Sequence, residues 1–216
     1  MIFADPKSHR EWLACRQLGI GGSDAGAVIG VNKYKSNTDL WREKVGEYKP
    51  DDISDKPAVK YGKEAEQHIR ALFALDYPEF EVEYHEFRMY CNETDKFMYA
   101  TLDGEFTTPD GKRGVLEIKT TTIQNSVQWE EWTDKIPDSY YVQVLHQLYC
   151  TGYDFAILRA YIRYYGKDGN LKATVKDYLI QRSDVEEDIK YIVSEERKFW
   201  ECVQKKQKPN LKLPNI

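Results

Sequence analysis

Residues 101–119 read TLDGEFTTPDGKRGVLEIK, and this stretch decides the fold. Its second half is a short apolar run that predicts a buried strand over 114–120. The residues at 107–112 include Pro, Asp and Gly, which favour a tight turn. A hairpin through this turn would bring Asp103, at the end of the preceding strand, beside Glu117.

Glu117 and Lys119 are expected on one face of this strand, because strand side chains alternate. With Asp103 they form a set of two carboxylates and one amine. Oxygen ligands of this kind bind Mg²⁺ or Mn²⁺, and a nearby Lys orients or activates a water. A plain turn Asp and an exposed Glu-x-Lys pair are the simpler interpretation. The apolar surroundings favour the metal site, because unpaired charges there would be costly.

The rest of the chain predicts helices and strands in alternating groups, which indicates an α/β (α+β) fold with a central mixed sheet flanked by helices. A single domain is expected over 1–208, followed by a loose C-terminal tail over 209–216. The predicted helices lie at 8–18, 24–30, 37–46, 57–75, 139–150 and 184–206. The predicted strands lie at 80–90, 96–102, 114–120, 155–165 and 172–181.

Composition excludes several classes of protein. The net charge of −5 argues against a protein that coats DNA with its whole surface, but hardly against a metal nuclease. The four Cys are scattered, which disfavours zinc and an iron–sulfur cluster and favours reduced cytosolic thiols. No signal peptide or membrane-length apolar run is apparent. The Cys positions are 15, 91, 150 and 202.

The segment at 19–24, GIGGSD, is a Gly-rich turn that leads into a helix. It is neither a Walker A loop nor a dinucleotide fingerprint, and Ala25 stands where a Gly-x-Ser-x-Gly elbow has its last Gly. Ser23 at the start of the helix is either a simple N-cap or, with free backbone N–H groups, part of an anion site. These two interpretations are equally supported by the segment, and Arg16 a few residues upstream would supply a positive charge for a phosphate.

Three further polar positions stand out on the predicted helices. Glu66 lies one turn after Gly62, and a Gly within a helix permits close approach of a ligand or another helix. Gln143 and Gln147 lie one turn apart with His146 between them, and an amide orients a water, holds an amine or contacts a phosphate. For Gln147 and His146, surface polar residues on an amphipathic helix are the favoured interpretation.

These segments together resemble the phage λ exonuclease / YqaJ viral recombinase family, a branch of the PD-(D/E)xK nucleases with a restriction-endonuclease-like core. The resemblance runs from Arg16 to the last helix, and its parts occur in the family's order. One departure is Leu102, where the family name calls for Pro. The matching parts are Arg16 with GIGGSD at 19–24, GKEAE at 62–66, LDG at 102–104, LEIK at 116–119 and Gln143-Val144.

The resemblance implies a role for each matching residue. Asp103, Glu117, the Ile118 carbonyl and Glu66 resemble the ligands of Mg²⁺, for which Mn²⁺ would substitute. Lys119 resembles the residue that positions or activates the attacking water. Gln143 resembles the amide that supports this Lys, although Gln147 is also placed to do so. The residues that resemble the pocket for a DNA 5′-phosphate are Arg16, Ser23 and Thr101.

The activity implied by the resemblance is metal-dependent 5′→3′ digestion of linear double-stranded DNA ends, which leaves 3′ single strands for phage-type recombination. A homotrimer, a single-strand annealing protein as partner and the cytoplasm of a bacterial host, in a phage or prophage context, are implied in the same way. Three alternatives remain open: a related endonuclease, a RecB-type nuclease module of other polarity, and a catalytically silent module that binds DNA ends.

Overall fold

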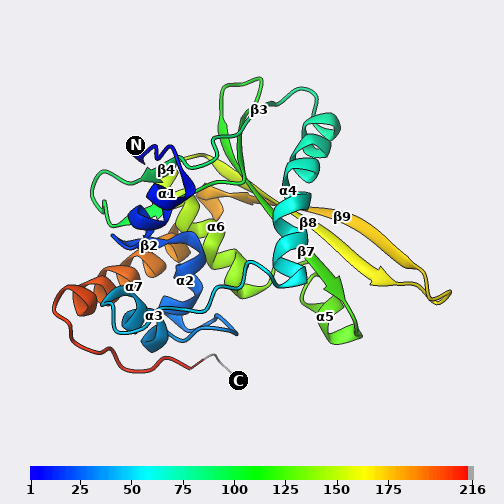
Figure 1. Ribbon diagram of the computed structural model, residues 1–216. Coiled ribbons are helices and arrows are strands. Elements are labelled where there is room, and N and C mark those ends of the chain that lie inside the picture. Colours follow the sequence, from blue (N-terminus) through cyan, green and yellow to red (C-terminus); the bar gives the residue numbers. More distant parts are fainter. Residues whose placement is uncertain (214–216) are drawn as a thin grey trace.

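The structure is a computed structural model that describes residues 1–213, apart from the side chain of Phe3 (Figure 1). The helices are α1 (His9–Arg16), α2 (Gly22–Ile29), α3 (Asn37–Lys44), α4 (Pro57–Asp76), α5 (Ser126–Glu130), α6 (Asp138–Thr151) and α7 (Glu186–Gln204), with a 3₁₀ turn at Arg182–Asp184. The strands are β1 (Ile2–Ala4), β2 (Ile20–Gly21), β3 (Glu81–Glu83), β4 (Met89–Cys91), β5 (Met98–Ala100), β6 (Gly104–Thr107), β7 (Arg113–Ile123), β8 (Phe155–Tyr165) and β9 (Leu171–Gln181).

The strands form two sheets. The larger has five strands in the order β3-β6-β7-β8-β9, and the smaller has four in the order β1-β4-β5-β2. In the larger sheet β7 and β8 run parallel and the other neighbours run antiparallel. Helices flank the larger sheet, and the β8–β9 hairpin projects beyond them (Figure 1). The prediction of a central mixed sheet flanked by helices is therefore confirmed.

The two faces of the larger sheet are covered by different helices. On one face, Ile69 and Phe73 of α4 pack against Leu116 and Ile118 of β7. On the other face, α6 packs its apolar side chains into the main core. Because β7 alternates, Glu117 and Lys119 turn toward α6, away from Leu116 and Ile118, as the sequence predicted.

The Gly-rich turn brings α2 against the smaller sheet. The Ile20 N–H donates to the Phe97 carbonyl at 2.7 Å. A Cβ at Gly19 would lie 2.0 Å from the same oxygen, so no larger residue fits. The helix begins at Gly22 with Gly21 as its N-cap, and the Asp24 carboxylate accepts from the Gly21 N–H at 3.2 Å. The N-cap interpretation of Ser23 was therefore wrong, because Gly21 is the N-cap and Ser23 is the second residue of the helix.

Several short elements differ from the predictions. The single strand expected over 80–90 is two strands, β3 and β4, which belong to different sheets. The connection at 84–88 carries the chain from one sheet to the other. The strands β1, β2 and β6 and the helix α5 were not anticipated, because two to five residues are too few for a periodic pattern.

The C-terminal segment makes specific contacts as far as the structure describes it. The Asn37 side chain donates to the Asn210 carbonyl at 2.8 Å and accepts from the Lys212 N–H at 3.0 Å. Lys212 also pairs with Glu195 at 2.5 Å. Residues 214–216 of the predicted loose tail lie outside the described residues, and the single-domain division stays a prediction.

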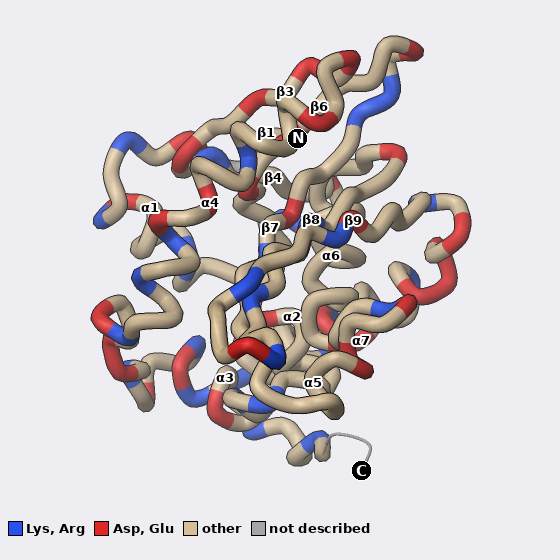
Figure 2. Tube along the Cα trace, turned by 90° about the vertical axis from the view of Figure 1, so that its right-hand side faces the viewer, with Lys and Arg blue, Asp and Glu red and all other residues tan. Residues whose placement is uncertain are grey.

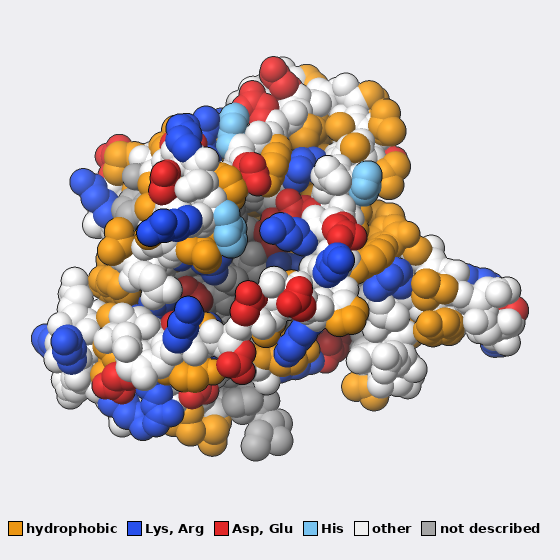
Figure 3. All heavy atoms as spheres, viewed as in Figure 1, with side chains coloured by type: hydrophobic (Ala, Val, Ile, Leu, Met, Phe, Trp, Pro, Cys, Tyr) orange, Lys and Arg blue, Asp and Glu red, His pale blue; other side chains and the backbone are white. Residues whose placement is uncertain are grey.

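Lys and Arg are interspersed with Asp and Glu along the chain trace (Figure 2). One face of the molecule is hollowed between the helical part and α4, and Lys, Arg, Asp and Glu side chains surround this hollow (Figure 3). In the described part of the chain, no helix combines the length and the apolar character that crossing a bilayer requires.

Candidate active site

The β6–β7 hairpin places Asp103 beside the strand that carries Glu117. Gly104 pairs with Leu116 across the hairpin, and Gly111 closes the turn at a φ of +82°, a conformation that favours Gly. The Asp103 Oδ2 atom accepts from the Ile118 N–H at 2.8 Å. This agrees with the predicted turn and with Asp103 beside Glu117, although Asp103 lies just before the unanticipated strand β6 and not at the end of the strand expected over 96–102. Leu102, which replaces the family's Pro, is buried in the main core.

Glu117 is only 1% exposed, and three side chains hold its carboxylate. Oε1 accepts from Lys119 Nζ at 2.6 Å and from Gln143 Nε2 at 2.7 Å. Oε2 accepts from Gln147 Nε2 at 2.6 Å. These partners replace the water that burial removes, so a charged carboxylate is tolerated in this apolar strand.

Lys119 lies between Glu117 and the amide of Gln143. Its Nζ donates to Gln143 Oε1 at 3.1 Å and lies 4.8 Å from the centre of the Tyr140 ring. Burial alone would lower the pKa of Lys119, but the nearby Glu117 and Asp103 carboxylates outweigh it and raise this pKa above the usual value. The amine therefore stays charged at neutral pH.

The α6 helix turns both glutamines toward β7. Gln147 is 1% exposed and His146 is fully buried, so their interpretation as surface residues was wrong. His146 Nδ1 lies 2.9 Å from a Glu196 carboxylate oxygen on α7, and Nε2 lies 2.9 Å from the Tyr99 carbonyl. Of the two glutamines left as alternatives, Gln143 contacts both Glu117 and Lys119, whereas Gln147 donates to Glu117.

Glu66 approaches the site from α4. Its carboxylate accepts from Arg70 Nη1 at 3.1 Å, and the same nitrogen donates to the Asp103 backbone carbonyl. Burial raises the pKa of Glu66, and the Glu117 charge adds to this effect while Arg70 opposes it. A Cβ at Gly62 would lie 3.2 Å from the Thr120 hydroxyl, so this Gly permits close approach of α4 to β7.

Arg70 is a site residue whose full role the sequence did not reveal. It joins Glu66 to the backbone of Asp103, and its guanidinium lies 3.6 Å from the centre of the Tyr84 ring. The i,i+4 spacing from Glu66 was a signal for the ion pair. No local pattern indicates the contact with Asp103, which is 33 residues away in the sequence.

The three carboxylates suit a hard divalent cation. Burial raises the pKa of Asp103 well above its usual range, and the charges of Glu117 and Glu66 raise it further. This concentration of negative charge is what a bound cation relieves, and carboxylate oxygens are the ligands that Mg²⁺ and Mn²⁺ prefer. Glu66, Asp103, Glu117 and the Ile118 carbonyl are the groups available to hold it.

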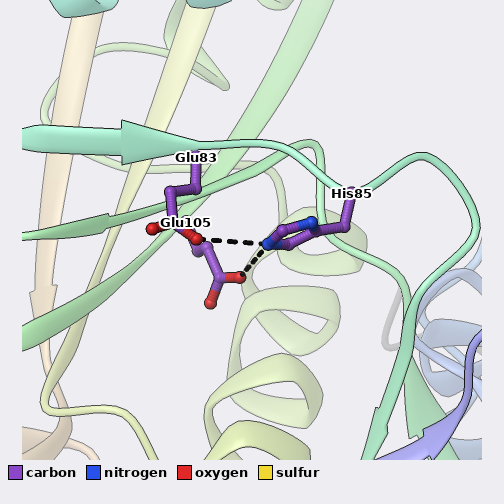
Figure 4. Close-up of side chains that lie close together, drawn as sticks. All are labelled: Glu83, His85 and Glu105. Atoms are coloured by element: carbon purple, nitrogen blue, oxygen red, sulfur yellow. Dashed lines mark hydrogen bonds and ion pairs between the residues drawn. The ribbon is translucent and has the colours of Figure 1, made fainter.

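A different cluster has the tighter ligand spacing. Among residues 1–213, Glu83, His85 and Glu105 are the three whose ligand atoms lie within 4.8 Å of one another (Figure 4). His85 Nε2 lies 3.2 Å from Glu83 and 3.3 Å from Glu105. Glu105 is buried and also accepts hydrogen bonds from Tyr90, Tyr153 and Arg113. These donors hold its carboxylate much as Lys119, Gln143 and Gln147 hold that of Glu117, so the cluster is a second group of residues that could hold a metal ion.

The residues assigned to a phosphate pocket lie around the end of α1. Arg16 Nη2 donates to the Ser23 hydroxyl at 3.0 Å. Thr101 joins this pair indirectly, because its hydroxyl accepts from Trp12 Nε1 at 3.1 Å and the Arg16 guanidinium lies 4.5 Å from the centre of the same indole. Trp12 was not singled out in the sequence, and no local pattern distinguished it from a core aromatic residue.

A buried ion pair lies next to the residues assigned to the phosphate pocket. Lys44 Nζ pairs with Asp24 at 2.9 Å, and both side chains are almost fully buried. Burial tends to raise the pKa of Asp24, but Lys44 and then Arg16 outweigh it and lower the pKa below the usual value. Lys44 also donates to the Arg16 carbonyl at 3.0 Å. The end of α1 and the start of α2 are thereby fixed to one another.

Comparison with known structures shows the same fold in exonucleases. An alkaline exonuclease from Laribacter hongkongensis superposes with a TM-score of 0.66 at 22% identity, covering 92% of this chain and 94% of that one. The same enzyme in complex with dAMP gives a TM-score of 0.60 at 20% identity, with the same coverage. A phage-related exonuclease from Haemophilus somnus 129PT gives 0.57 at 13% identity, covering 88% and 96%.

Sequence comparison identifies the family. The uncharacterized protein YqaJ of Bacillus subtilis (strain 168) is 32% identical over 161 residues, which are 68% of this chain and 44% of that protein. The matched region thus spans less than half of that relative. Residues 11–154 match the YqaJ-like viral recombinase domain. This match covers about two thirds of the chain and includes Arg16, Ser23, Glu66, Thr101, Asp103, Glu117, Lys119 and Gln143, so the chain belongs to the YqaJ-like viral recombinase family.

Proposed function

We propose that this chain is a divalent-metal-dependent exonuclease that digests linear double-stranded DNA. The observation that carries the proposal is the arrangement of Asp103, Glu117 and Lys119 at the β6–β7 hairpin, with Gln143 bonded to both members of the Glu117–Lys119 pair. This is a set of oxygen ligands next to a charged amine. Such a set suits hydrolysis of a phosphodiester, in which negative charge builds up on the phosphate.

The preferred metal in this proposal is Mg²⁺, with Mn²⁺ able to substitute. Asp103, Glu117, Glu66 and the Ile118 carbonyl would hold it, and the raised pKa of Asp103 supports the fit. The ion would supply Lewis acidity and a more acidic bound water. Lys119 binds a phosphate oxygen or the attacking water, Gln143 fixes the Lys119 amine, and Arg70 holds Glu66 toward the site.

Strand polarity in this proposal is 5′→3′, and it depends on the pocket of Arg16, Ser23 and Thr101. One guanidinium and two hydroxyls suit a terminal phosphate, and the N-terminus of α2 adds favourable backbone N–H groups. The product would be a 3′ single strand available for recombination. A homotrimer, a single-strand annealing protein as partner and action in the cytoplasm of a bacterial host complete the proposal.

The test uses linear duplexes labelled at the 5′ or the 3′ end, with Mg²⁺ or with EDTA. We expect Mg²⁺-dependent release of nucleotides from the 5′ end and no nicking of covalently closed circles. Lys119→Met should abolish release without unfolding, whereas the exposed Lys63→Met on α4 should leave it unchanged. Nicking of circles would indicate an endonuclease and 3′ release the opposite polarity. Binding of DNA ends without cleavage would indicate a silent module.

A further inference from the structure

Trp12 connects the two parts of the proposed phosphate pocket. Its Nε1–H donates to the Thr101 hydroxyl at 3.1 Å, and its ring lies under the Arg16 guanidinium at 4.5 Å. The indole also packs against two other rings, whose centroids lie 5.5 Å (His9, stacked) and 6.3 Å (Phe87, tilted) from its own. One side chain of α1 therefore orients groups from two separate segments of the chain.

The hydrogen bonds decide which way the pocket hydroxyls point. A hydroxyl has one donor hydrogen and accepts through its lone pairs. The Thr101 oxygen accepts from Trp12, and the Ser23 oxygen accepts from Arg16. Each O–H hydrogen then points away from the N–H that it faces, so each hydroxyl can donate to a bound group. The two hydroxyls thus become donors, which suits an anion such as a phosphate.

The charge of Arg16 is available for the same anion. Its guanidinium contacts a hydroxyl and an aromatic ring, and no carboxylate pairs with it within the part of the chain that the structure describes. Its backbone is fixed, because the Arg16 carbonyl accepts from Tyr99 Oη at 2.7 Å and from Lys44 Nζ at 3.0 Å. Asp24, whose pKa the Arg16 charge helps to lower, is paired directly with Lys44, so the fixed Arg16 guanidinium can still bind a phosphate.

We propose that Trp12 is a positioning residue that sets the preference for a 5′-phosphate over a 5′-hydroxyl end. Its indole N–H occupies the Thr101 oxygen, which leaves the Thr101 hydroxyl hydrogen to donate to the phosphate, and its ring packs against the guanidinium of Arg16. This inference rests on the proposed exonuclease function and refines it. Thr101 also lies two residues before Asp103, so the same indole hydrogen bond fixes the segment that leads to a proposed metal ligand.

The test is Trp12→Phe, which keeps an aromatic ring beneath Arg16 and removes the N–H. Single-turnover cleavage of duplexes with 5′-phosphate and 5′-hydroxyl ends gives a rate ratio for each protein. We expect this ratio to fall by about tenfold, the effect of one lost charge-assisted contact, mainly through weaker binding of the phosphorylated end. A purely structural role would slow cleavage of both ends equally and leave the ratio unchanged.

The matched control is Trp41→Phe, since the Trp41 indole donates to the Cys202 carbonyl at 3.2 Å, outside the pocket. It should leave the ratio unchanged. Thr101→Val removes the other end of the Trp12 bond, so it should lower the ratio similarly, and the double variant should fall little further. If Trp12→Phe does not fold, Thr101→Val alone provides the test.

The outcomes separate the inference from the proposed function. A wild-type protein that cleaves neither end refutes both. Cleavage without any preference for a 5′-phosphate leaves the nuclease proposal standing and overturns the role of Trp12. An unchanged ratio in Trp12→Phe, or equal losses in Trp12→Phe and Trp41→Phe, also overturns this role.

Discussion

Asp103→Asn is expected to stabilise the metal-free protein while it abolishes cleavage. The Asn oxygen can still accept from the Ile118 N–H, and the Arg70 contact is to the backbone carbonyl, so both survive the change. What disappears is one negative charge beside Glu117 and Glu66. Burial and these two charges raise the pKa of Asp103, which means that its charged form is disfavoured in the folded protein.

The size of the effect follows from the balance of charges around Asp103. As a general scale, two like charges about 5 Å apart repel by about 3 kcal/mol at an effective dielectric constant near 20. Attraction to Lys119 opposes this repulsion and is also lost in the variant. We therefore expect a net stabilisation of roughly 1–2 kcal/mol, which raises the melting temperature of a chain of this size by roughly 2–8 °C.

The effect should depend on pH with a definite sign. The folded-state pKa of Asp103 is raised above its ordinary value of 3.8. In the wild type, the contribution of Asp103 to stability is therefore fully present below its pKa in the unfolded chain. This contribution is lost as the pH rises through its pKa in the folded protein. The Asn variant has no such loss. Its advantage should be absent in acid and should grow above about pH 4.

The assay is thermal and urea unfolding in EDTA across this pH range, repeated with Mg²⁺ at neutral pH. Mg²⁺ should raise the melting temperature of the wild type and have little effect on the variant, because binding to the folded state stabilises it. Asp51→Asn, in an exposed loop, is the matched control and should change nothing. A variant that melts lower than the wild type in EDTA at neutral pH would refute the reasoning.

Three further substitutions test the core beneath the site. Gln147→Leu removes a donor to Glu117, but it also removes a buried Oε1 atom that lacks a hydrogen-bond partner among the described residues. The free energy of unfolding, measured in urea, should therefore change by no more than about 1 kcal/mol, while single-turnover cleavage slows. Gln143→Leu breaks contacts with both Glu117 and Lys119, so its cleavage rate should fall further than that of Gln147→Leu; an equal fall contradicts the special role of Gln143. His146→Leu leaves Glu196 as an uncompensated buried charge, so it should lower the free energy of unfolding, measured in urea, by about 3–5 kcal/mol. A loss under about 1 kcal/mol would show that the His146–Glu196 pair is not ionic.

Local patterns were sufficient for much of the site. Alternation along β7 predicted that Glu117 and Lys119 share a face, and the turn at 107–112 predicted that Asp103 lies beside them. Both are properties of neighbouring residues, which sequence periodicity and turn chemistry report directly. The long helices follow from the same kind of evidence.

Contacts between distant segments were not predictable from these patterns. His146 and Gln147 were interpreted as surface residues, because nothing near them in the sequence shows that Glu196 and Glu117 lie against their helix face. Trp12 is one of five Trp, and only the folded chain places its indole against Thr101. Burial of a polar residue depends on its partners, and here each partner lies at least 30 residues away.

The protonation of Lys119 constrains how the proposed reaction depends on pH. Burial opposes it, but the neighbouring carboxylates raise the pKa of Lys119 in the metal-free protein, so the amine enters the reaction with its proton at neutral pH. Two of its three hydrogens go to Glu117 and Gln143, which leaves one to hold a water or a phosphate oxygen. The rise in rate on the acid side of the pH–rate profile should therefore come from Asp103 and Glu66. Their pKa values are raised, and each binds a cation as a carboxylate only when the pH is above its pKa. Single-turnover rates at saturating Mg²⁺ should rise with pH through this acid range and stay high at neutral pH. A rate that rises only as Lys119 loses its proton, well above neutral pH, would show that the amine is the base.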